Sequence, residues 1–97
     1  MKFNQAQLNH LSTMRFINKV DDKLKIVTAV RLPKDESALT DQLLLVLELF
    51  YDGEKINVLS FNLHNFTYEE IVDVARNIQK SDFIMQEVDT YLAGEIE

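Results

Sequence analysis

The amino-acid sequence predicts an α+β fold, in which a small antiparallel β-sheet of three to four strands precedes two C-terminal α-helices. Three observations lead to this class. Apolar and polar residues alternate over residues 23–32, the pair Asp52-Gly53 separates two apolar runs, and apolar residues at helical spacing follow Thr67. A chain of 97 residues with one such set of elements is predicted to be a single domain, residues 1–97.

The N-terminal third is predicted to contribute two strands. Residues 11–20 are expected to be extended, although apolar residues at helical spacing also fit a short helix over residues 4–15. Residues 23–32 alternate between two faces, which is the pattern of a half-buried strand. One face is apolar, and the other carries three basic residues: Lys23, Lys25 and Arg31.

Two connections follow from the turn-forming residues. With Asp21-Asp22 as a two-residue loop, Ile17 would lie opposite Ile26. Pro33 ends the alternating pattern, and the polar residues 33–42 are predicted to form a connecting loop. Because this loop is too long for a tight hairpin, the order of the strands in the sheet stays open.

Asp52-Gly53 predicts a β-hairpin, because a type I′ turn requires a positive φ at both of its central residues. A regular register from this turn places Leu47 opposite Val58 on one face. The other face then presents six large apolar side chains: Leu44, Val46, Phe50, Leu59, Phe61 and Leu63. Both faces of the hairpin are apolar, whereas an antiparallel sheet with one solvated face normally alternates.

The C-terminal third is predicted to hold the two helices. Thr67 and Glu70 have the spacing of a capping box at the start of the first helix. Ser81 is the predicted N-cap of the second helix, and Gly94 is its predicted C′ residue. The apolar stripes of the two helices can cover one face of the sheet.

The second face of the sheet has two possible covers. Either a helix of this chain lies on it, formed by the N-terminal segment or by one of the C-terminal helices, or another protein molecule does. A large exposed apolar patch favours another molecule. We therefore expect a non-catalytic protein–protein interaction domain that self-associates through its sheet as a homo-oligomer. The six apolar residues named above are the predicted interface with the partner.

The net charge of −6 is unevenly distributed along the chain. Residues 1–34 carry seven basic and two acidic residues, whereas residues 35–97 carry three basic and fourteen acidic ones. The acidic remainder disfavours non-specific binding of nucleic acid. Two alternatives to the interaction domain remain. One is a small acidic inhibitor that occludes a nucleic-acid-binding site of another protein, and the other is a nucleic-acid binder that uses the basic strand face.

Several kinds of chemistry are not expected. The chain has no cysteine, so thiolate metal sites and a cysteine nucleophile are excluded. Its two glycines lie far apart, at positions 53 and 94, and form no phosphate-binding loop. Neither His10 nor His64 has a recognisable catalytic partner, so we expect no enzyme, cofactor or metal. Without an apolar run of about 20 residues or a secretory h-region, we expect a cytoplasmic protein that does not enter a membrane.

Overall fold

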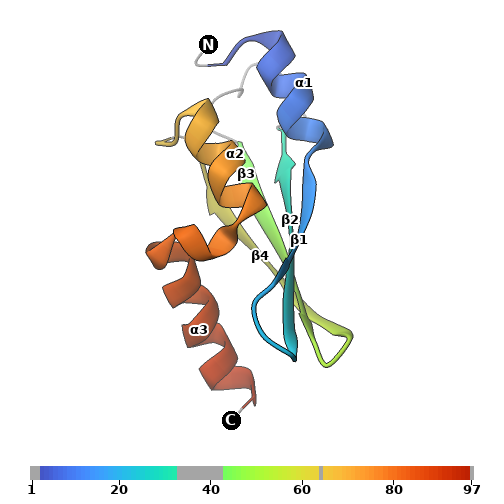
Figure 1. Ribbon diagram of the computed structural model, residues 1–97. Helices are drawn as coiled ribbons and strands as arrows, with labels where there is room; N and C mark the ends of the chain where they lie inside the picture. The colour runs from blue at the N-terminus through green and yellow to red at the C-terminus, as the bar shows by residue number, and fades with distance from the viewer. Residues whose placement is uncertain (1–2, 33–42, 64, 97) are drawn as a thin grey trace.

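The computed structural model describes residues 3–32, 43–63 and 65–96, and the predicted α+β class is confirmed (Figure 1). An N-terminal helix and four strands precede the C-terminal helices. The N-terminal segment combines both of the alternatives left open, because a helix ends at Thr13 and a strand begins at Arg15. In chain order the elements are α1 (Gln5–Thr13), β1 (Arg15–Lys19), β2 (Leu24–Arg31), β3 (Leu44–Tyr51), β4 (Glu54–Asn62), α2 (Tyr68–Arg76), the 3₁₀ helix η3 (Ile78–Lys80) and α3 (Asp82–Ile96).

The sheet is a meander in which each strand pairs antiparallel with the next, in the order β1-β2-β3-β4. The order left open by the sequence is thereby settled: β2 and β3 are neighbours in spite of the long connection between them. The predicted loop over residues 33–42 and the candidate histidine His64 lie outside the described residues.

The predicted two-residue loop between β1 and β2 is wrong, and the register of the two strands differs by one residue from the predicted one. Residues 20–23 connect the strands, and Ile17 pairs with Val27 instead of Ile26. The Asp21 carboxylate accepts hydrogen bonds from the amides of Lys23 and Leu24, both at 2.8 Å. These bonds hold the pKa of Asp21 below its usual range. An aspartate that folds its side chain back onto the backbone makes a wider loop, which needs no positive φ.

The second hairpin begins as predicted and then departs from the predicted register. Asp52 and Gly53 have φ values of 53° and 85°, so the type I′ turn is confirmed. Phe50 pairs with Lys55, but the register shifts between Leu49 and Phe50, so that Leu49 pairs with Asn57. Ile56 is the extra residue of a β-bulge in β4.

This bulge reverses the predicted orientation of the rest of β4. Because side chains alternate along a strand, a shift of one residue moves each of them to the opposite face. Leu59 therefore pairs with Leu47 and Phe61 with Leu45, on the face that meets the helices. Val58, which was predicted to share a face with Leu47, pairs with Glu48 on the other face.

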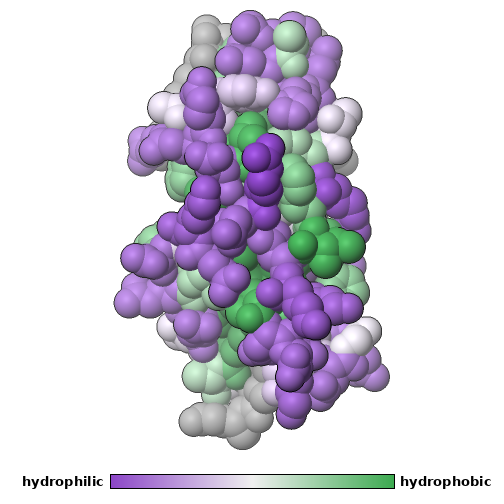
Figure 2. Space-filling view, viewed as in Figure 1, coloured by the Kyte–Doolittle hydropathy of each residue, from purple (hydrophilic) through white to green (hydrophobic). Residues whose placement is uncertain are grey.

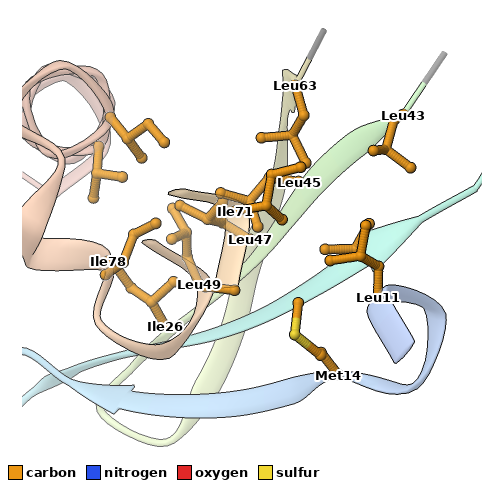
Figure 3. Packing of buried hydrophobic residues seen from close by; sticks show 14 of the residues in the cluster. Leu11, Met14, Ile26, Leu43, Leu45, Leu47, Leu49, Leu63, Ile71 and Ile78 are labelled. Atoms are coloured by element: carbon orange, nitrogen blue, oxygen red, sulfur yellow. The ribbon is translucent and has the colours of Figure 1, made fainter. Parts of the chain in front are cut away.

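The core lies between one face of the sheet and all of the helices. Leu45, Leu47 and Leu49 of β3 are fully buried and form its centre. In Figure 3, Ile71 of α2 and Ile78 of η3 reach the same sheet face, and Leu11 of α1 points toward it from one end. The alternatives with a helix on the second face are therefore wrong for the described part of the chain.

A buried polar network joins the sheet to the break between α2 and η3. The Asn18 side chain accepts from the Ile78 amide at 3.0 Å and donates to the Ala75 carbonyl at 3.4 Å. The Thr28 hydroxyl donates to the same carbonyl. Asn18 and Thr28 are the two buried polar residues among those described. They satisfy a free carbonyl at the end of one helix and a free amide at the start of the next.

The predicted helix starts are confirmed, and one predicted end is wrong. Thr67 and Glu70 form the capping box of α2, with bonds of 2.8 and 3.2 Å. The Ser81 hydroxyl accepts from the Ile84 amide at the start of α3. Gly94 does not terminate α3, which continues to Ile96, and its φ is not positive. A glycine marks a C′ position only where the chain turns into the left-handed region.

The described molecule is elongated, with extents of 43, 22 and 20 Å. Seen from the direction of Figure 1, hydrophilic side chains cover most of the surface and hydrophobic ones form separate patches between them (Figure 2). Among the described residues, each helix is too short or too polar to cross a membrane.

A pair of substitutions at neighbouring positions tests the bulge. Leu59→Lys should lower the free energy of unfolding by about 1–2 kcal/mol, because it removes a half-buried apolar side chain that packs against the core. Val58→Lys should change it by less than about 1 kcal/mol, because Val58 is exposed on the other face. Urea unfolding followed by circular dichroism measures both. If Val58→Lys were the more damaging substitution, the register would be the regular one.

A second set of substitutions tests the buried polar network. Asn18→Ala should cost about 2–3 kcal/mol, because it leaves the buried Ile78 amide without its acceptor. Thr28→Val keeps the shape of the side chain and should cost about 1 kcal/mol. The control is Asn9→Ala on the exposed side of α1, with an expected change below about 0.5 kcal/mol. Equal effects of the two asparagine substitutions in chemical denaturation would contradict the assigned role of Asn18.

Candidate functional site

The face of the sheet that is turned away from the helices is the candidate site, and we call it the open face. Its apolar residues belong neither to the core cluster nor to the apolar side chains packed against that cluster. Ile17 is 72% exposed and Val58 is 39% exposed, the two largest values among apolar side chains of the sheet. The chain thus presents apolar side chains on both faces of one sheet but places its described helices on one.

Strand pairing arranges the open face in four rows that run across the sheet. One end of the face is a row of Arg31, Leu44 and Asn62. The next row is Arg15, Ala29, Val46 and Ser60. The third is Ile17, Val27, Glu48 and Val58. The row nearest the Asp52-Gly53 turn is Lys19, Lys25, Phe50 and Lys55.

The structure divides the predicted apolar interface between two faces. Leu44, Val46 and Phe50 lie on the open face as a group. The other three predicted members lie on the helix side: Leu63 is fully buried, and Leu59 and Phe61 pack against the core. The grouping of all six on one face is therefore wrong, because it rested on the regular hairpin register that the bulge interrupts.

The predicted basic strand face lies on the same open face as these apolar residues. Lys25 pairs with Phe50 and Arg31 pairs with Leu44. Lys23 is separate, because it lies in the connection between β1 and β2. Arg15 and Lys19 of β1 complete the basic side chains contributed by the first two strands. The basic and apolar residues were predicted as two separate sites. The pairing of β2 with β3 brings them together on one face.

Lys55 was not predicted as a site residue, but it belongs to the part of the open face that is held together by ion pairs. Glu48 accepts from Lys55 Nζ at 2.9 Å and from Arg15 Nη2 at 3.1 Å. Arg15 reaches Glu48 from β1 across β2, where its cross-strand partner is the small residue Ala29. The Lys55 hydrogen bond, together with both positive charges, holds the pKa of Glu48 below its usual range.

A shallow depression of about 400 Å³ lies beside this ion-pair cluster. Ala29 and Val46 line it between the strands, and the side chains of Arg15, Arg31 and Glu48 stand around it. Because the residue at its centre is small and two arginines line it, this depression can accommodate a side chain of another molecule. An anionic side chain would find guanidinium donors there.

Other parts of the surface offer less chemistry. The His10 ring on α1 is hydrogen-bonded to the Tyr68 hydroxyl at the start of α2. Phe83 of α3 is 63% exposed and meets Phe61 edge to face. Within the described residues, His, Asp and Glu side chains do not gather into a group of three or more that could hold a metal ion.

In comparisons with known proteins, no family model, curated protein or solved structure matches this chain.

The ion-pair cluster predicts a pH dependence of stability. Since the pKa of Glu48 is lower in the folded state, its stabilising contribution is present above the pKa of the unfolded state. That contribution is lost as the pH falls through the folded pKa. Glu48→Gln should therefore lower the free energy of unfolding at pH ~7 more than at pH ~3. Urea unfolding at the two pH values measures this, with Glu87→Gln on α3 as the exposed control. An equal effect of Glu48→Gln at both pH values would contradict the prediction.

Proposed function

We propose that this protein is a non-catalytic protein–protein interaction domain whose docking surface is the open face. The observation that carries the proposal is the exposure of Ile17 and Val58 in one row of a sheet whose described helices all pack on the other face. Apolar side chains in such a position are stabilised when another molecule covers them, by about 25 cal/mol per Å² of apolar area.

The size of the open face fits an interface of modest affinity. Four strands about 4.8 Å apart and four rows about 6.8 Å apart span roughly 500 Å². A standard interface buries about 800 Å² on each partner. Val27 and Val46 are already buried by their neighbours, so the apolar gain comes mainly from the more exposed side chains around them. A partner that covers this face and its charged rim would therefore form a reversible complex.

A second copy of the chain is one candidate partner, as the sequence predicted. The exposed Ile17 favours it, because two such apolar rows could pack on each other. Charge opposes symmetric pairing: the face carries five basic side chains against the single acid Glu48 among its described residues. In a two-fold dimer the same patch meets itself, so these like charges would be brought together. Self-association stays a prediction.

Nucleic acid is the candidate from a different class, and the five basic side chains of the open face favour it. Non-specific binders combine such charges with aromatic rings on which the bases stack. Phe50 is the aromatic residue of the open face among the described residues. Val27, Ala29 and Val46 occupy the other central positions beside Glu48, and apolar aliphatic side chains next to an acid fit the surface of another protein better than a run of bases.

A matched pair of variants tests the proposed function. Ile17→Ser combined with Val58→Ser removes exposed apolar area from the open face, whereas Phe83→Ser removes a similarly exposed ring from α3. Proteins captured from the native cells by the wild type should be retained by Phe83→Ser and depleted about tenfold or more by the double variant. Quantitative mass spectrometry measures this, after circular dichroism has shown that both variants are folded. Equal capture by all three proteins would refute the open face as the docking surface.

A further inference from the structure

We propose that the occupant of the open face is an acidic, amphipathic segment of a different protein. Its carboxylates meet the basic rows at the two ends of the face, and its apolar side chains cover the row that contains Ile17 and Val58. This inference rests on the proposed function and names the chemistry of the partner.

The first argument for an acidic partner concerns the row of side chains nearest the Asp52-Gly53 turn. Lys19 and Lys25 are direct cross-strand partners, and Lys25 and Lys55 flank Phe50. Like charges directly opposite each other destabilise a strand pair. Within the described residues neither Lys19 nor Lys25 takes part in an ion pair. A carboxylate placed over this row would turn an unfavourable pair of ammonium groups into a favourable site.

The second argument for an acidic partner concerns the opposite end of the open face. Arg31 has no ion pair among the described residues, and it lines the depression together with Ala29 and Val46. Arginine binds a carboxylate through two parallel hydrogen bonds, so a partner's aspartate or glutamate inserted here would be held in a defined orientation.

The middle of the face is different because its charges are partly neutralised. Glu48 is paired with both Arg15 and Lys55, which leaves a net charge of +1 on these three side chains beside the apolar row. The first and last rows are six residues apart along a strand, which corresponds to about 20 Å. A helical segment would bridge that distance with acidic groups about 13 residues apart. The face therefore favours an apolar segment with acidic ends.

The charge of the open face favours an acidic protein segment over a second copy of the chain and over nucleic acid. A second copy would bring an equally basic face to this one, and nucleic acid would leave the apolar middle against sugars and phosphates. The remainder of the molecule also repels nucleic acid, because residues 67–94, which cover α2, η3 and most of α3, carry six acidic and two basic residues. An acidic protein segment is attracted by the open face and satisfies its apolar middle.

The experiment selects ligands without assuming their sequence. A phage-displayed library of random peptides of about 16 residues, long enough to span the face as a helix, is selected against the immobilised wild-type protein. We expect enriched peptides that combine Asp or Glu with large apolar residues. Their binding, measured by fluorescence anisotropy, should weaken about tenfold or more when salt rises from about 50 to about 300 mM. Amide chemical shifts should place them on β1–β4.

Variants identify which charges act. Lys19→Ser with Lys25→Ser, and separately Arg31→Ser, should each weaken the selected peptides about tenfold, whereas Lys80→Ser on η3 should leave their affinity unchanged. These side chains are exposed, so the variants should fold normally.

Each other outcome overturns the inference in a distinguishable way. Peptides that bind the open face but lack acidic residues would refute the acidic partner and leave the proposed function standing. Tighter binding of single-stranded oligothymidine, lost in the same lysine and arginine variants, would assign the face to nucleic acid. A wild-type dimer in sedimentation that Ile17→Ser dissociates would assign it to a second copy. An absence of enriched peptides, or peptides that map to the helices, would remove both the inference and the docking surface.

Discussion

The β-bulge at Ile56 is the constraint on which the distribution of side chains in this molecule depends. The Asp52-Gly53 turn sets one register at the tip of the hairpin, and the extra residue replaces it with another a single residue later. Leu59 and Phe61 can thereby join Leu47 and Leu45 under the helices, while Val58 is turned to the open face. Without the bulge, Leu59 and Phe61 would lie on the open face, and Val58 and Ser60 would take their places under the helices.

The buried contacts of Asn18 explain how one face of the sheet receives all of the described helices. A helix that ends over a sheet leaves carbonyl groups without partners, and a buried unpaired carbonyl is costly. Asn18 and Thr28 bind Ala75 at the end of α2, and Asn18 also binds the first amide of η3. The chain can therefore change direction within the core and continue into α3 on the same side, along β4 (Figure 1).

The parts that could be predicted from the sequence are those with local causes. Asp52-Gly53, the Thr67–Glu70 capping box and the alternation of β2 each depend on residues that are close together in the chain. The bulge has no such signal, because every residue around Ile56 fits either register as an isolated strand. Asn18 likewise resembles an ordinary strand residue until its partners, 57 and 60 positions away, are known. For the same reason the ion pairs of Glu48 were not foreseen.

Glu48 also explains how a sheet with two apolar faces can be compatible with water. On the open face it holds Arg15 and Lys55 over the strands, where their aliphatic stems cover part of the apolar surface and their charges stay solvated. The basic side chains at both ends add mutual repulsion, which opposes face-to-face association of identical molecules. A partner that reverses this charge pattern experiences attraction at the same positions. For the proposed docking surface, the same arrangement of charge would disfavour a second copy and would restrict which partner can approach.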